Sequence, residues 1–196
     1  MTAPWTPSQR SRRAIEHLAL AGALAMTMTT ADSALLAGTE RAPNLQTSAV
    51  VAFTPGQALP LVLDTIRGAR TSILVAAYAF TSRPIAVALR DAARGGVKVF
   101  VVVDAGEAAT AYSAAQFLAN ARVPVRLNAR YALQHNKFMV IDGASVQTGS
   151  LNYTASAGAR NAENVLVLRN APMIAAQYEA EWQRLWNEGT DLPPTY

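Results

Sequence analysis

Apolar and polar positions in the first two thirds of the chain alternate between strand-like and helix-like patterns. Short apolar runs rich in β-branched residues predict strands over 49–53, 72–80, 97–103 and 123–127. Helical spacing predicts helices between them, over 58–68, 84–94 and 108–120. Because strand runs are separated by helices of this length, we expect an α/β fold. Its single domain has a mixed, mostly parallel sheet with helices on both faces.

The last third of the chain has a different pattern. Two short apolar runs, 137–141 and 145–148, flank Asp142-Gly143, which predicts a hairpin because glycine tolerates the positive φ of a tight turn. A further strand is predicted over 162–168 and a closing helix over 172–187. In that helix Tyr178, Trp182 and Trp186 recur every fourth residue, which indicates a stripe packed on the core.

The N-terminal residues have the pattern of a signal peptide. Arg10, Arg12 and Arg13 precede an apolar, alanine-rich run over 18–28, and Ser11-Arg12-Arg13 resembles a twin-arginine signal. The run is shorter than the ~20 residues that span a bilayer, which favours cleavage over a retained anchor.

We therefore expect a signal peptide over 1–34, a linker over 35–47, a catalytic domain over 48–190 and a tail over 191–196. The mature protein is expected to be periplasmic or secreted, without stable membrane association.

Composition excludes some chemistry. The chain has no cysteine, so disulfides, a thiolate nucleophile and a thiolate metal site are all excluded. The formal net charge of +4 is compatible with a polyanionic partner such as nucleic acid. Four arginines, Arg83, Arg122, Arg126 and Arg130, are candidates for a phosphate track.

Candidate chemistry is concentrated around the predicted hairpin. His135 and Lys137 stand two apart at the start of a strand, so their side chains share one face. The returning strand brings Gly149, Ser150 and Asn152 back to the same end. An imidazole, an ammonium, a hydroxyl and a carboxamide then meet in one patch. This set suits phosphoryl transfer, with the imidazole as nucleophile and the other groups holding the phosphate oxygens.

Glu163 follows shortly after this segment. Its carboxylate can accept a hydrogen bond from the second ring nitrogen of His135 and so fix the imidazole tautomer. We therefore add Glu163 to the candidate catalytic residues.

The spacing His135-x-Lys137-x₄-Asp142-x₆-Gly149-Ser150-x-Asn152 resembles the signature of the phospholipase D superfamily. The strand order and the Asn161-Ala162-Glu163-Asn164 segment are similar to its small secreted bacterial endonucleases.

This resemblance implies a phosphohistidine intermediate on His135, phosphate binding by Lys137, Ser150 and Asn152, and support of His135 by Glu163. It implies no metal and no cofactor. Asp142 begins the predicted turn, so we expect it, like Gly149, to be a structural member of the motif.

A single motif predicts two chains at one site. The sequence holds two histidines, His17 and His135, and signal removal leaves only His135. Cleavage by this route needs a nucleophile and also an acid for the leaving oxygen, and one imidazole cannot be both in the same step. We expect a two-fold homodimer that shares one site, the alternative being a monomer in which a lysine or water is the acid.

Three other functions stay open at this point. A phospholipase D acting on phosphatidyl lipids would use the same motif. A metal-dependent nuclease would use Asp104 and Glu107, which follow a buried strand. A nucleic-acid-binding module without activity would carry a degenerate motif. Nucleic acid cleavage by a metal-independent endonuclease is the preferred interpretation.

Overall fold

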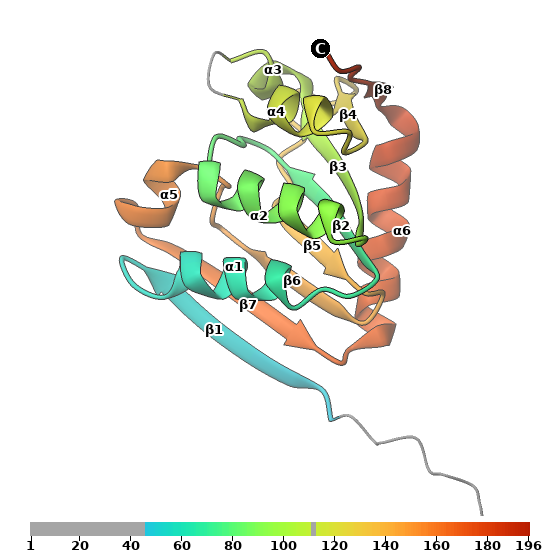
Figure 1. Ribbon diagram of the computed structural model, residues 1–196. Coiled ribbons are helices and arrows are strands. Elements are labelled where there is room, and N and C mark those ends of the chain that lie inside the picture. Colours follow the sequence, from blue (N-terminus) through green and yellow to red (C-terminus); the bar gives the residue numbers. More distant parts are fainter. Residues whose placement is uncertain (1–45, 111–112) are drawn as a thin grey trace, which may run out of the picture. The chain divides into compact units, whose positions relative to one another are not determined.

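The computed structural model describes residues 46–110 and 113–196 (Figure 1). The predicted signal peptide and most of the predicted linker lie outside these residues. Eight strands form one sheet in the order β1-β7-β6-β5-β2-β3-β4-β8. The strands are β1 Ser48–Thr54, β2 Ser72–Ala77, β3 Lys98–Asp104, β4 Val125–Asn128, β5 Phe138–Ile141, β6 Ser145–Gly149, β7 Glu163–Arg169 and β8 Thr190–Asp191. The helices are α1 Ala58–Arg67, α2 Arg83–Arg94, α3 Ala105–Ala108, α4 Ala114–Asn120, α5 Ala155–Ala159 and α6 Pro172–Glu188.

The sheet is mixed, as expected, but the expectation that it is mostly parallel is wrong. Only β2–β3 and β3–β4 pair in parallel, where a helix intervenes between consecutive strands. The pairs β1–β7, β7–β6, β6–β5, β5–β2 and β4–β8 are antiparallel. A short turn joins β5 to β6, so these two strands run in opposite directions. β5 also runs opposite to its other neighbour, β2.

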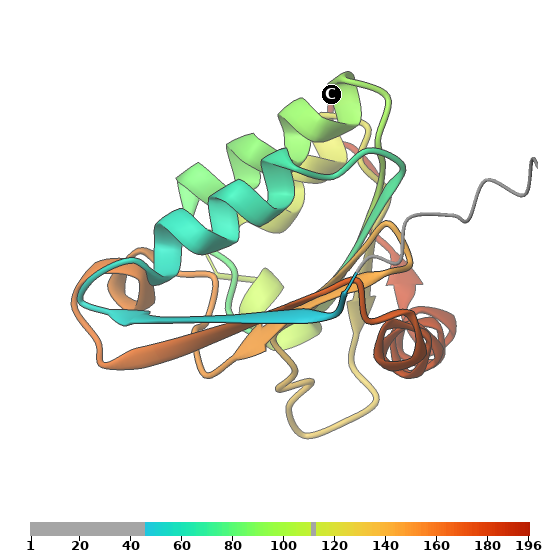
Figure 2. The same ribbon diagram turned by 90° about the horizontal axis from the view of Figure 1, so that it is seen from below.

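Helices cover both faces of the sheet. α1 and α2 lie on one side and α6 on the other (Figures 1 and 2). Successive residues of β2 therefore enter different clusters, with Val75 buried towards α1 and α2 and Ala76 buried towards α6. The aromatic stripe packs as predicted, since Trp182 is buried and its indole N–H donates to the Val75 carbonyl at 2.9 Å.

Two local predictions differ from the structure. The helix predicted over 108–120 is divided into α3 and α4, because Asp104 caps the first and Ser113 caps the second. The segment expected to be a tail begins at Asp191, but this residue belongs to β8, which pairs with β4. The Asp191 carboxylate also accepts a hydrogen bond from Arg126 at 2.6 Å. Among the described helices, none has the length and apolar character that crossing a bilayer requires.

Candidate functional site

Four strand ends meet at one edge of the sheet. The end of β2, the start of β5, the end of β6 and the start of β7 are brought together by the pairings of Ala76 with Phe138, Phe138 with Thr148, and Gly149 with Val165. A pocket of about 470 Å³ opens there, which we call the reaction pocket. Every predicted site residue apart from Asp142 lines it: His135, Lys137, Gly149, Ser150, Asn152 and Glu163.

His135 and Lys137 form a close pair. The Lys137 Nζ lies 3.0 and 3.3 Å from the two ring nitrogens of His135 and donates to the His135 carbonyl oxygen at 2.7 Å. Burial lowers the pKa of Lys137, and the Glu163 carboxylate partly offsets this. Imidazole and ammonium therefore face the pocket together, as predicted, although both residues precede β5 and do not lie within the strand.

Tyr78, which follows β2, supports this pair and was not among the predicted site residues. Its ring packs against the imidazole of His135 with centroids 4.5 Å apart, and the Lys137 ammonium lies 5.3 Å from the same ring centroid. The negative face of an aromatic ring attracts a cation at this distance. Burial, followed by the neighbouring Glu107 carboxylate, raises the pKa of Tyr78.

The segment that enters the site is held by Gln134, a further residue without a predicted role. The Gln134 side chain is buried, donates to the Ala77 carbonyl at 3.1 Å and accepts from the Asn136 N–H at 2.8 Å. Its own N–H donates to the buried Asp104 carboxylate at 2.8 Å. These bonds tie both sides of His135 to β2 and β3.

The same contact involves Asp104, which the alternative of a metal-dependent nuclease would use as a metal ligand together with Glu107. Asp104 accepts hydrogen bonds from the N–H groups of Gln134 and Glu107, at 2.8 and 3.1 Å. Its carboxylate therefore serves the His135 segment and the cap of α3.

Ser150 and Glu163 form the second polar pair. Ser150 Oγ donates to Glu163 Oε2 at 2.6 Å and accepts from the N–H of Asn164 at 3.0 Å. The other carboxylate oxygen of Glu163 accepts from Asn161 at 2.9 Å. In residues 46–110 and 113–196 no hydrogen bond joins Glu163 to His135, so the expected support of the imidazole is replaced by a bond to Ser150.

Asn152 and Gly149 complete the pocket wall. The Asn152 side-chain oxygen is buried and has no hydrogen-bond partner within the described residues. A half-turn of the carboxamide exchanges its oxygen and NH₂, so this group can present a donor to a phosphate oxygen. Gly149 has a φ of 148°, and a Cβ there would overlap the Asn164 carbonyl, so this position requires glycine.

Asp142 lies at the far end of β5. Its carboxylate accepts from the backbone N–H groups of residues 70–72 and from the Thr71 hydroxyl, over 2.8–3.1 Å. Although burial opposes the change, these donors lower the pKa of Asp142. The motif aspartate thus anchors the entry to β2.

Comparison with known proteins agrees with this geometry. A family model described as "Cardiolipin synthase, PLD-like domain" matches residues 62–186. A phospholipase D of Rickettsia bellii is 37% identical over 131 residues, which are 66% of this chain and 65% of that protein. A mitochondrial cardiolipin hydrolase of Xenopus laevis is 36% identical over 135 residues, which are 69% of this chain and 63% of that protein.

Solved structures give the same relationship. The crystal structure of Nuc from Salmonella typhimurium, a phospholipase D family member, superposes with a TM-score of 0.74 at 37% identity. The match covers 76% of this chain and 99% of Nuc. NucT from Helicobacter pylori, at 23% identity and a TM-score of 0.68, shares the fold. With a family match over more than half of its length and one His-x-Lys motif, the chain belongs to the small, single-motif branch of the phospholipase D superfamily.

Proposed function

We propose that the protein is a metal-independent phosphodiesterase that cleaves nucleic acid as a non-specific endonuclease, outside the cytoplasm. The observation that carries the proposal is the convergence of His135, Lys137, Ser150 and Asn152 on one open pocket. The N-terminal signal pattern supports export to the periplasm or the medium.

The reaction has two steps. A neutral ring nitrogen of His135 attacks phosphorus, an N–P bond forms, and the P–O bond to one half of the strand breaks as that oxygen takes a proton from an acid. Water then attacks the phosphohistidine, an O–P bond forms and the N–P bond breaks. The water gives its proton to the acid that protonated the leaving oxygen in the first step, so that acid is restored. The Lys137 ammonium and the Asn152 carboxamide hold the non-bridging oxygens as their negative charge grows.

Ser150 and Glu163 have supporting roles in this scheme. Because the hydroxyl of Ser150 donates to Glu163 at 2.6 Å, Ser150 orients the carboxylate when no phosphate is bound. Substrate phosphate competes with the carboxylate for that donor. The Glu163 carboxylate also opposes the lowering of the Lys137 pKa by burial.

The acid in this scheme is His135 of a second copy. An apolar strip supports a two-fold dimer: the aligned residues Thr148, Leu166 and Val51 lead from the pocket to the edge strand β1. On β1 the side chains of Val51 and Phe53 are 55% and 62% exposed, and apolar side chains exposed together commonly mark an interface. Packing two such strips about a two-fold axis brings the two pockets together.

Two observations favour nucleic acid over lipid as the substrate. The net charge is positive, and Arg83 lines a second hollow of about 300 Å³ with Thr81 and Ser113. Thr81 donates its N–H to the Tyr153 carbonyl, one residue from Asn152, which ties the segment that carries this hollow to the segment that carries Asn152. The similar proteins named phospholipase D and cardiolipin hydrolase make phosphatidyl lipids the competing substrate.

A cleavage assay tests this function. We expect the mature protein to cut plasmid DNA or RNA in excess EDTA, and His135→Ala to abolish cutting while preserving the fold. Release of head group from phosphatidylcholine or cardiolipin without any cutting of nucleic acid would show that the substrate is lipid.

The dimer has its own test, by sedimentation. Val51→Asp is expected to give inactive monomers, whereas Met173→Asp, at an exposed apolar position of α6, is expected to remain an active dimer. A wild-type protein that is fully active as a monomer contradicts the shared site.

A further inference from the structure

A second cavity adjoins the reaction pocket on the side of α6. This groove of about 320 Å³ lies between the segment that leads to His135 and the C-terminal half of α6, and we call it the loop groove. His135 and Asn136 line both the loop groove and the reaction pocket. A group bound in the groove is therefore close enough to be covalently joined to the phosphate that His135 attacks. We propose that the loop groove binds a nucleobase next to the scissile phosphate, an inference that rests on the proposed nuclease function.

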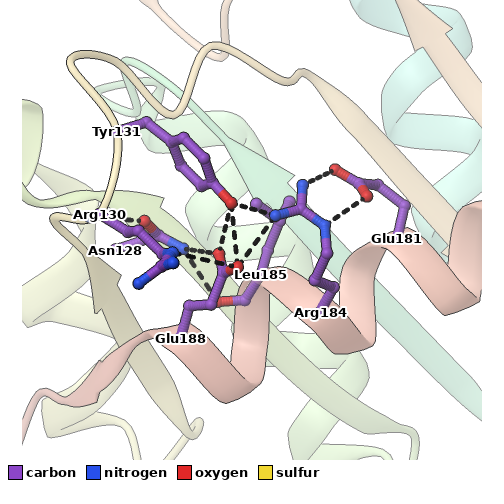
Figure 3. A network of polar contacts seen from close by, with 7 residues as sticks. All are labelled: Asn128, Arg130, Tyr131, Glu181, Arg184, Leu185 and Glu188. Carbon is purple, nitrogen blue, oxygen red and sulfur yellow. Dashed lines mark hydrogen bonds and ion pairs between the residues drawn. The ribbon is translucent and has the colours of Figure 1, made fainter. Parts of the chain in front are cut away.

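The charge of the groove is already balanced, which disfavours a second phosphate. Its cation, Arg184, is bound on one side by Glu181, with Nη2–Oε1 and Nε–Oε2 distances of 2.6 and 2.9 Å. On the other side it is bound by Glu188 at 3.0 Å (Figure 3). The hydrogen bond that Arg184 donates to Glu181 raises the pKa of Arg184, whose guanidinium is paired with carboxylates on both sides. Arg130 also pairs with Glu188, at 3.6 Å, so two guanidiniums are matched by two carboxylates. A network in which the charges are already balanced has little net attraction for a further phosphate, which favours an uncharged occupant.

The wall of the groove is held rigidly. The Tyr131 hydroxyl contacts Arg184 and both carboxylate oxygens of Glu188, the latter at 2.9 and 3.0 Å (Figure 3). The buried Asn128 side chain donates to the Leu185 carbonyl at 3.0 Å, which fixes the start of the loop on α6. Gln134 fixes its other end on β2 and β3. A wall held in this way loses little conformational entropy when a ligand packs against it.

The groove is open, and part of its surface is apolar. Leu133 is 53% exposed and Tyr131 is 39% exposed, and both side chains line the groove. The Arg184 guanidinium already lies over the Tyr131 ring, 5.3 Å from its centroid. Leu133 and the uncovered part of the ring are left for a flat, uncharged group with an apolar face. A nucleobase has this chemistry, and bases pack on aromatic and apolar side chains without regard to sequence.

Asn136 adds a polar contact at the boundary. It is half-buried and lines both cavities, and its backbone N–H is bound by Gln134. No hydrogen bond of its carboxamide is formed within residues 46–110 and 113–196. This group can donate to or accept from the edge of a base that packs on Leu133.

Two matched single strands test the inference. One is a short oligothymidylate, and the other has the same length but carries a hydrogen-capped abasic sugar at every position. Both contain the phosphate that His135 attacks, and only the first has bases. We expect the wild-type protein to have the lower KM on the strand with bases.

Leu133→Ser is expected to raise the KM for the base-bearing strand about 5-fold to 150-fold, the range for loss of one stacking contact. It is expected to leave both the KM for the abasic strand and kcat unchanged. Tyr131→Ala is expected to act in the same direction, and Tyr131→Phe, which keeps the ring, is expected to retain most of the preference. Met173→Ser, at another exposed apolar residue that lines neither cavity, is the control and should change neither KM.

The outcomes separate the inference from the function on which it rests. Equal KM values of the wild-type protein for the two strands, or an equal effect of Leu133→Ser on both, overturn the base site and leave the nuclease intact. Failure of the wild-type protein to cut either strand, with release of head group from phosphatidylcholine vesicles, overturns the proposed function itself. In that case Leu133 would face a lipid.

Discussion

Replacing Gln134 by leucine tests how His135 is positioned. The change keeps the side-chain volume and removes two hydrogen bonds, to the Ala77 carbonyl and from the Asn136 N–H. Each buried polar group left unpaired costs about 1–3 kcal/mol, and Asn136 is only half-buried, so we expect a total loss of about 2–4 kcal/mol. A shift of the imidazole by about 1 Å lowers the rate by roughly 10²-fold. The expected result is therefore a large fall in kcat with a smaller change in KM.

The assay needs a control of equal instability. Ile66→Ala, in the buried face of α1 and outside the pocket, is expected to cost about 3 kcal/mol of unfolding free energy without changing kcat. Urea unfolding and steady-state cleavage of bis(p-nitrophenyl) phosphate are measured on both variants. If Gln134→Leu loses stability and keeps the kcat of the wild-type protein, the bonds of Gln134 do not position His135.

Three further changes have outcomes set by single contacts. Gly149→Ala is expected to lose more than about 3 kcal/mol of unfolding free energy because its Cβ overlaps a backbone carbonyl, whereas Gly143→Ala, at a φ of 61° with open space around it, should lose about 1 kcal/mol. Equal losses in urea unfolding would contradict the overlap. Glu163→Gln removes the charge that raises the pKa of Lys137, so the alkaline limb of the kcat/KM profile should move to lower pH, and a shift to higher pH would contradict this. Asp142 has a folded-state pKa below its ordinary 3.8, so its stabilisation is complete above 3.8 and is lost as the pH falls through the folded value. Asp142→Asn should therefore cost about 1 kcal/mol at neutral pH, and the gap from the wild-type protein should close in acid; a gap independent of pH in urea unfolding refutes this.

The reaction pocket could be predicted because its parts are close in sequence. His135 and Lys137 directly precede one strand of a hairpin, and Ser150 and Asn152 follow the other, so the Asp142-Gly143 turn and the antiparallel pairing are enough to bring them together. Spacing within one hairpin is information that the sequence contains directly.

The supports of the pocket could not be predicted in the same way. Asp104 holds Gln134 across thirty residues of chain, and this contact depends on where the end of β3 lies in the finished sheet. Glu163 was expected to contact His135, and the β6–β7 register instead brings its carboxylate to Ser150. These are tertiary contacts without a local sequence pattern.

The order of the strands was the least predictable feature of the fold. Alternating strand and helix patterns identified β1, α1, β2, α2 and β3 but not their partners. β5 pairs with β2 and β1 pairs with β7, so the sheet is largely antiparallel although its first half has the pattern of a parallel one. Pairing between strands far apart in the chain depends on packing of the whole sheet.

Covalent phosphate on His135 is the most direct test of the mechanism. Single-turnover cleavage is quenched with alkali, which preserves phosphohistidine, and the peptide that contains His135 is weighed by mass spectrometry. We predict a mass increase of one phosphoryl-linked fragment on that peptide, which disappears after acid treatment and never forms in His135→Ala. Complete turnover with an unmodified His135 peptide at every time point would contradict the account.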